Sequence, residues 1–121
     1  MKPHVKTLLL TLLTFVLLTG CSRVDDKTIL AARNAVNQGA VIVDVRTPKE
    51  FQKGHVANAL NIPIETLSKS LQQVPKNRII VVYCASGNRS GSATKLLTAN
   101  GWTVYDVATQ GDYERKIEPK K

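Results

Sequence analysis

One of the two cysteines in the chain stands where nucleophilic chemistry is readily done. Cys84 ends the apolar run IIVVYC, a small polar loop follows it, and Arg89 lies five positions further on. Where a strand leads into a helix N-terminus, backbone N–H groups and a partial positive charge converge on the connecting loop. The thiolate is the nucleophilic form of cysteine. The spacing therefore predicts an ionised Cys84, favoured by loop amides and by the Arg89 guanidinium.

A free cysteine at a strand end is also commonly no more than a small buried apolar residue. The neighbouring residues favour the reactive interpretation, because Gly87 permits a left-handed turn and Asn88 tolerates one. Small side chains leave room for a ligand above the sulfur. The candidate binding loop comprises Ala85, Ser86, Gly87, Asn88, Arg89 and Ser90. Ser86 and Ser90 are candidate hydrogen-bond donors to a bound sulfur, with helix capping as the alternative role of Ser90.

The strands that must position this loop are expected to be short and buried. Continuous apolar, β-branched runs of this kind are typical of parallel strands covered on both faces. In parallel α/β sheets, sites lie beyond the carboxyl ends of the strands, which is where Cys84 falls. The predicted strands are 40–45, 59–63, 78–84 and 102–107.

The helices are expected between these strands. Asp25 or Asp26 should cap the first, and Thr47 with Glu50 should form a capping box at the second, where Pro48 takes the first helical position. The predicted helices are 28–38, 47–55, 64–74, 90–101 and a final turn at 111–117. This alternation predicts one α/β domain, a parallel sheet with helices on both faces.

Residues 1–20 are predicted to lie outside that domain. Lys2 and Lys6 precede the apolar run TLLLTLLTFVLL, which is too short for a span of about 20 residues, and small residues follow. This pattern is typical of a secretory signal. LTGC at 18–21 resembles the lipobox of bacterial lipoproteins, which implies cleavage before Cys21 and diacylation of its thiol. An ordinary signal peptide with a chance cysteine is the alternative.

On this interpretation the chain divides into a cleaved signal peptide (1–20), a lipidated N-terminus and tether (21–26), the domain (27–117) and a basic tail (118–121). Cleavage removes two of 17 basic residues and none of 9 acidic ones, so the formal charge falls from +8 to +6. The protein is expected to face the periplasm at the cell envelope. Ser22 after the cysteine favours the outer membrane if the source is Gram-negative.

Acylation of Cys21 would leave Cys84 without a disulfide partner in the chain. In an oxidising compartment a lone thiol is a liability unless it is buried or used. The sequence shows no metal-ligand spacing, no nucleotide-binding loop and no basic patch interleaved with aromatic residues. We therefore expect no metal, no cofactor and no nucleic-acid partner.

Two segments resemble the single-domain rhodaneses, which are thiosulfate sulfurtransferases. They are VIVDVRTPKEFQKGHVANALNIP at 41–63 and IIVVYCASGNRSGSATKLLTANGW at 79–102, and the resemblance spans roughly residues 27–112. It implies a rhodanese-like fold and an enzyme that moves a sulfane sulfur from thiosulfate or a similar donor to cyanide or a thiol. Cys84 would carry that sulfur as a persulfide.

The resemblance also implies supporting roles for residues near the first strand. Asp44 and Arg46 match the Asp-x-Arg of the family, and Glu50 with His55 matches its Glu-Phe-x-x-Gly-His element. Glu50 is the candidate for a bidentate pair with Arg89, with a simple capping-box role as an equal alternative. We interpret His55 as a structural residue in preference to an acid–base group.

Two alternatives and one departure accompany this interpretation. Related phosphatases and arsenate reductases have five residues between cysteine and arginine, whereas this chain has four, which suits a single sulfur atom. A non-catalytic rhodanese-fold module that binds partners or senses sulfur is the second alternative. The segment ATQGDYERKI lacks the Gly-Gly and the later tryptophan that follow the last strand in many family members, which leaves pocket shape open.

Overall fold

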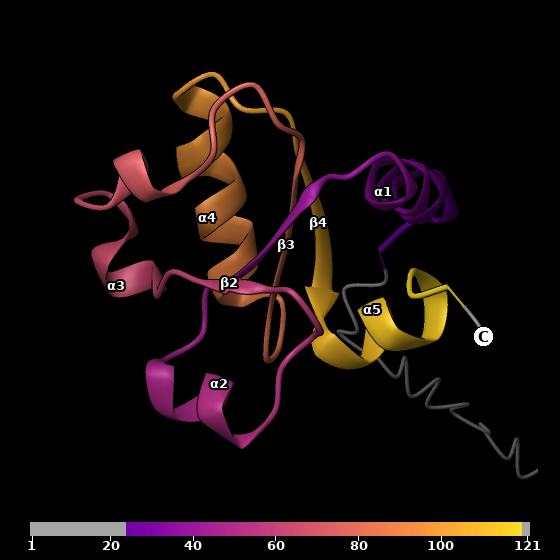
Figure 1. Ribbon diagram of the computed structural model, residues 1–121, viewed down its shortest axis with the longest axis horizontal. Coiled ribbons are helices and arrows are strands. Elements are labelled where there is room, and N and C mark those ends of the chain that lie inside the picture. The colour runs from indigo at the N-terminus through magenta and orange to yellow at the C-terminus, as the bar shows by residue number, and fades with distance from the viewer. Residues whose placement is uncertain (1–23, 120–121) are drawn as a thin grey trace, which may run out of the picture.

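A four-stranded parallel sheet in the order β2-β1-β3-β4 lies at the centre of the molecule (Figure 1). The computed structural model describes residues 24–119. The strands are β1 (Val41–Asp44), β2 (Leu60–Asn61), β3 (Ile80–Cys84) and β4 (Val104–Thr109). The expected signal peptide, Cys21 and most of the tether lie outside the described residues.

Helices cover both faces of this sheet, which confirms the predicted α/β architecture. In Figure 1, α1 and α5 lie on one side of β3 and β4, and α3 and α4 on the other. None of the helices within 24–119 combines the length and the apolar character that crossing a bilayer requires. The helices are α1 (Asp26–Asn37), α2 (Pro48–Lys53), α3 (Ile64–Leu67), α4 (Asn88–Ala99), α5 (Gln110–Lys116) and the 3-10 turn Leu71–Gln73.

Alternation along β3 divides the hydrophobic core into two parts. Ile80, Val82 and Cys84 pack beneath α3 and α4, whereas Val81 and Tyr83 point to the face covered by α1 and α5. All five side chains are fully buried. Since successive side chains of a strand point to opposite faces, this central strand is apolar throughout, as its position between two helical layers requires.

The helix caps follow the predicted residues closely. The Asp25 carboxylate accepts the Thr28 N–H at 2.7 Å and caps α1. At α2, Thr47 and Glu50 form the reciprocal capping box, with Pro48 in the first turn. These short polar side chains satisfy N–H groups that the helix itself leaves unpaired, so they set where each helix begins.

The single helix predicted at 64–74 is wrong, because α3 ends at Leu67 and the helical conformation is lost by Ser70. Ser70 has φ −122° and ψ 19°, and the 3-10 turn follows it. Serine side chains compete with the helical backbone for hydrogen bonds, and two of them flank Lys69 here. Leu67 and Val74 are nevertheless both buried, so the apolar spacing predicted their burial correctly and missed only the break.

The last strand also differs from its predicted bounds, since it begins two residues later. Trp102 belongs to the turn after α4: its backbone N–H donates to the Leu97 carbonyl at 3.1 Å. Its indole N–H donates to the Pro75 carbonyl at 2.9 Å. A side chain fixed in this way anchors the turn and delays the start of pairing with β3.

At its other end β4 is lengthened by a bulge beside Cys84. Val82 pairs with Asp106 but Cys84 pairs with Thr109, so the register shifts between them. Ala108 lies within the bulge with φ 64°, a left-handed conformation that costs a non-glycine residue free energy. The Asp106 carboxylate accepts the Ala108 N–H at 2.9 Å and holds this turn in place.

Replacement of Tyr83 by phenylalanine tests how the α1/α5 face is held. The Tyr83 hydroxyl oxygen accepts the buried Val56 N–H at 3.0 Å. Loss of this acceptor should lower the free energy of unfolding by about 1–3 kcal/mol, measured by urea denaturation with Trp102 fluorescence. Alkylation of Cys84 should keep its wild-type rate, because the two side chains point to opposite faces. A Tyr83→Phe protein as stable as wild type would contradict this account.

Candidate active site

The Cys84 sulfur lies at the junction between β3 and the N-terminus of α4. The Gly87 N–H donates a hydrogen bond to Cys84 Sγ at 3.0 Å. Gly87 has φ 98° and is the N-cap residue of α4, where no side chain caps the helix. The left-handed turn that Gly87 adopts is disfavoured for other residues, and it aims this N–H back toward the sulfur. The predicted amide cradle is therefore present at Gly87.

Ser90 is the second group beside the sulfur. Its Oγ lies 3.5 Å from Cys84 Sγ and donates to the Gly87 carbonyl at 3.1 Å. The residue is fully buried and lies in the first turn of α4, not at its N-cap. The capping role considered for Ser90 is therefore wrong, and its hydroxyl instead joins the sulfur to the loop backbone.

These contacts change the acidity of the Cys84 thiol. Burial, the largest single effect, raises its pKa. Hydrogen bonds from the Ser90 hydroxyl and N–H, and from the N–H groups of Ser86 and Gly87, lower it and outweigh burial. The net result is a pKa below the ordinary value, so the thiolate is more populated than in a free cysteine.

Arg89 is held by Glu50 from the neighbouring helix α2. Arg89 Nη1 donates to Glu50 Oε1 at 2.7 Å and Nη2 donates to Oε2 at 3.0 Å, a bidentate pair. About a third of each side chain is exposed. The guanidinium therefore lies beside the loop with its charge balanced by a carboxylate, while the sulfur forms its hydrogen bonds with the Gly87 N–H and the Ser90 hydroxyl.

Glu50 fulfils both roles between which the sequence left a choice. Its Oε1 also accepts the Thr47 N–H at 3.3 Å, and its own N–H donates to Thr47 Oγ1 at 3.2 Å. The Arg89 hydrogen bonds, the largest effect, and those of Thr47 lower the pKa of Glu50 from 4.5 to about 2. One carboxylate thus closes the capping box of α2 and fixes the arginine of the loop.

Asp44 and Arg46 lie on the other face of the sheet. Asp44 pairs with Tyr83 in register, so its side chain points away from the face that holds Cys84. Arg46 Nη2 donates to Asp44 Oδ2 at 2.7 Å and to the Gly54 carbonyl at 2.7 Å. Its guanidinium carbon lies 5.5 Å from the centre of the Tyr83 ring. This buried pair fixes the loop after α2 and does not contact the sulfur.

The remaining predicted residues are exposed at the surface around the Cys84 loop and α2. Ala85, Ser86 and Asn88 are exposed. His55 stacks on Phe51 with ring centres 3.6 Å apart, and its Nδ1 lies 2.8 Å from the Phe51 carbonyl oxygen. His55 is exposed on the loop after α2, which agrees with the structural interpretation. Within 24–119, no three His, Cys, Asp or Glu side chains gather as they would around a metal ion.

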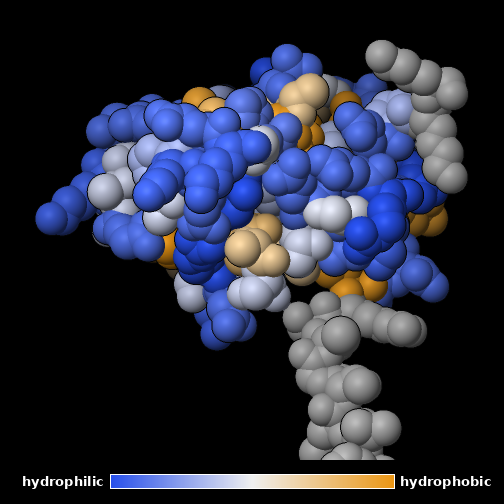
Figure 2. Space-filling model, turned by 90° about the horizontal axis from the view of Figure 1, so that it is seen from below, coloured by the Kyte–Doolittle hydropathy of each residue, from blue (hydrophilic) through white to orange (hydrophobic). Residues whose placement is uncertain are grey.

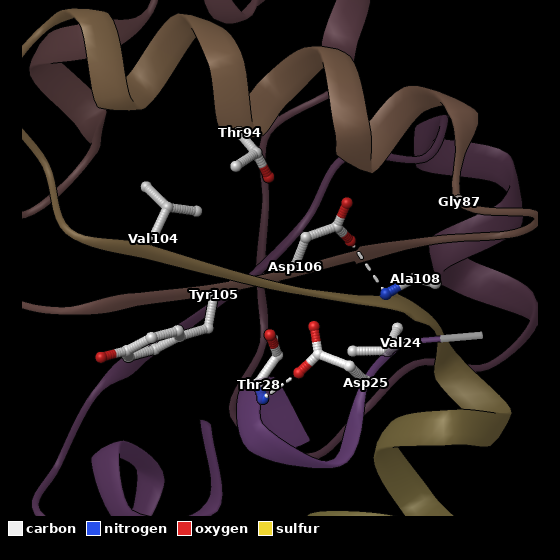
Figure 3. A pocket seen from close by; sticks show the side chains of 9 residues that line it. All are labelled: Val24, Asp25, Thr28, Gly87, Thr94, Val104, Tyr105, Asp106 and Ala108. Carbon is white, nitrogen blue, oxygen red and sulfur yellow. Dashed lines mark hydrogen bonds between the residues drawn. The ribbon is translucent and has the colours of Figure 1, made fainter. Parts of the chain in front are cut away.

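A pocket of about 410 Å³ lies behind the Cys84 loop, and the sequence did not predict it (Figure 3). Gly87 and Thr94 come from α4 and its N-cap, Asp106 and Ala108 from the bulged end of β4, and Val24 from the segment before α1. Alanine has no preference for a positive φ, so nothing at Ala108 signalled the bulge that shapes this wall. Ala108, the first residue of the segment that departs from the family pattern, therefore lines a pocket that Gly87 of the loop also lines.

Three comparisons relate this geometry to known proteins. The chain matches the family model described as Rhodanese-like domain over residues 28–110. It is 35% identical over 77 residues to a protein named sulfurtransferase from Allochromatium vinosum, covering 64% of this chain and 72% of the relative. It is 40% identical over 68 residues to the thiosulfate sulfurtransferase PspE of Escherichia coli, covering 54% of this chain and 65% of PspE. A rhodanese-related protein from Thermoplasma volcanium superposes with a TM-score of 0.60 at 29% identity, covering 72% and 91% of the two chains.

Replacement of Ser90 by alanine should raise the pKa of Cys84. The Ser90 hydroxyl is one of the groups that lower this pKa, so its loss should move the alkylation profile of Cys84 to higher pH. The measurement is the pH dependence of Cys84 alkylation by iodoacetamide. Ser92→Ala is the matched control, because Ser92 is exposed in the same helix. An unchanged alkylation profile in Ser90→Ala would remove Ser90 from the site.

The Glu50–Arg89 pair should stabilise the fold in a pH-dependent way. The folded-state pKa of about 2 lies below the ordinary 4.5, so the contribution is complete above about pH 4.5 and is lost as the pH falls toward 2. Glu50→Gln should therefore melt below wild type at pH 7, and the two melting temperatures should converge in acid. Glu114→Gln, at an exposed glutamate of α5, is the control. A constant difference between pH 7 and pH 2 would refute the assignment.

Proposed function

The chain belongs to the rhodanese-like domain family, and on this premise we propose that it is a sulfurtransferase that takes its sulfur from thiosulfate or a similar donor. Relatives named sulfurtransferases support sulfur transfer as the general chemistry. The observation that carries the proposal is the cysteine of the loop: Cys84 Sγ accepts the Gly87 N–H and lies beside Ser90 at a helix N-terminus.

The proposed reaction has two displacement steps at sulfur. The Cys84 thiolate attacks the outer sulfur of thiosulfate, the S–S bond of the donor breaks, and sulfite leaves with the bonding electron pair. Cys84 is then a persulfide with a terminal anionic sulfur. An acceptor such as cyanide attacks this outer sulfur, forms thiocyanate and releases Cys84 as the thiolate. No net proton or electron is needed with cyanide as acceptor.

The loop is suited to hold both charged forms of the cysteine. Partial positive charge at the start of α4 and the N–H groups of Ser86, Gly87 and Ser90 favour an anion on Cys84. The Ser90 hydroxyl can turn from the Gly87 carbonyl toward the sulfur when the thiol ionises, since the two acceptors are 3.1 and 3.5 Å away. Ala85 and Ser86 within the loop are small and exposed, which favours room for the second sulfur once the loop moves.

One observation favours a non-catalytic binding or sulfur-sensing module as the second candidate. Cys84 has no exposed surface in this structure, so a donor must displace loop atoms to reach the sulfur. The lowered pKa of its thiol favours the enzyme, because a purely structural cysteine gains nothing from ionisation.

We propose further that the protein is exported and held at the cell envelope by acyl chains on Cys21. The support is the apolar run, its basic start and the LTGC segment at 18–21. This location would place Cys84 in an oxidising compartment, where a protected, low-pKa thiol can meet small sulfur anions before other oxidants consume it.

Intact-mass spectrometry of the full-length protein extracted from membranes tests both parts. The extracted protein should lack residues 1–20 and carry acyl chains, which Cys21→Ser should lose.

Thiosulfate should add about 32 Da, one sulfur atom on a reactive thiolate, to wild type and nothing to Cys84→Ser. Cyanide-dependent thiocyanate formation should disappear in Cys84→Ser and remain in Cys21→Ser. No mass increase with any sulfane donor would reject the enzyme in favour of the module.

A further inference from the structure

We propose that the edge of the sheet at which Cys84 lies faces the polar surface of the membrane, so that sulfur donors and acceptors meet the enzyme among the lipid head groups. The inference rests on the anchor at Cys21 proposed above. It adds an orientation, which neither the anchor nor the sulfur chemistry specifies: the same anchor on the opposite edge would leave Cys84 open to the bulk solution.

The tether between the proposed anchor and the domain is short. Only Ser22 and Arg23 separate the proposed acylated residue from Val24. Three residue steps of extended chain reach at most about 10 Å. Val24 itself is not free to move away, because it packs against the core beneath α1 and α5. The surface around Val24 must therefore stay close to the head groups that hold Cys21.

Val24 lies close to the loop that holds the sulfur. Val24, Gly87 and Ala108 line the same pocket of about 410 Å³, and Figure 3 shows them together at one end of it. The Gly87 N–H is the group bonded to Cys84 Sγ at 3.0 Å. The place where the tether enters the domain is thus separated from the reactive sulfur by one small pocket, on the same edge of the sheet.

The surface at this edge of the sheet is mostly polar. Figure 2 views the molecule from the end toward which the β4 arrow points in Figure 1, and hydrophilic residues cover most of this face. In the described part of the chain, the large apolar side chains with high exposure are Leu30 and Leu60. A face of this kind contacts head groups without inserting among acyl chains. Asp25, Asp26 and Lys27, which follow Val24 directly, are exposed and carry charges of both signs, so the tether and not a charge attraction sets the orientation.

The orientation restricts which partners can reach Cys84. A small anion or a thiol carried at the membrane surface can enter the narrow space between domain and bilayer. A bulky soluble protein cannot enter it without first tilting the domain away. We therefore infer that the partners are small or membrane-bound.

The test compares two tether lengths on the lipidated full-length protein in phosphatidylcholine vesicles. One variant carries about 20 inserted Gly/Ser residues between Arg23 and Val24, which add roughly 25 Å of mean reach. The readout is the alkylation rate of Cys84 by N-ethylmaleimide and by a maleimide with a long polyethylene glycol chain. The same insert appended after Lys121 is the matched control, since it leaves the tether unchanged.

With the native tether the bulky maleimide should react at least several-fold more slowly than with the lengthened tether, while N-ethylmaleimide reacts equally with both. The appended control should match the native protein. Equal rates for the bulky reagent, on protein whose mass shows acylated Cys21, would overturn the orientation and leave the anchor and the enzyme standing. Absence of acyl chains would overturn the anchor together with this inference, and neither result depends on persulfide formation.

Discussion

The hydrogen bond from the Gly87 N–H to the Cys84 sulfur is the contact that links the sheet to the chemistry. It forms only because three conditions meet: β3 ends at residue 84, Gly87 takes a left-handed conformation, and α4 begins directly afterwards. Burial alone would make this thiol harder to ionise, and the hydrogen bonds of the loop reverse that effect. The packing of the central strand and the reactivity of its last residue are therefore set by the same few atoms.

The alternation of side chains along a strand explains why neighbouring residues of the sheet have different roles. Cys84 and Tyr83 are consecutive, yet one faces the helix that supplies the amides and the other faces the Asp44–Arg46 pair. The side chain of Asp44 points to the same face of the sheet as that of Tyr83, because the two residues are paired in register. The family resemblance gave Asp44 and Arg46 a supporting role at the site. Because they lie on the opposite face of the sheet from Cys84, they instead support the loop after α2.

Much of this arrangement was predictable because it depends on local patterns. The apolar runs located the strands, the Asp25 and Thr47 caps located two helices, and the spacing of Cys84 and Arg89 identified the loop. The missed features depend on the tertiary structure. The bulge at Ala108 arises from the pairing of β4 with β3, and Ser70 ends a helix that the apolar spacing would have continued. The dual bonding of Glu50 required two helices to approach each other, which neither segment could show alone.

Because one carboxylate, that of Glu50, bonds both Thr47 and Arg89, the first turn of α2 and the position of Arg89 depend on each other. Fraying of the first turn of α2 would move Glu50 Oε1 away from the Thr47 N–H. The same movement would disturb Arg89 at the start of α4, which bonds that oxygen. Aspartate, one methylene shorter, would have difficulty reaching Thr47 and Arg89 at the same time. The first turn of α2, about 35 to 40 residues before the loop in the chain, thereby influences the electrostatic surroundings of the sulfur.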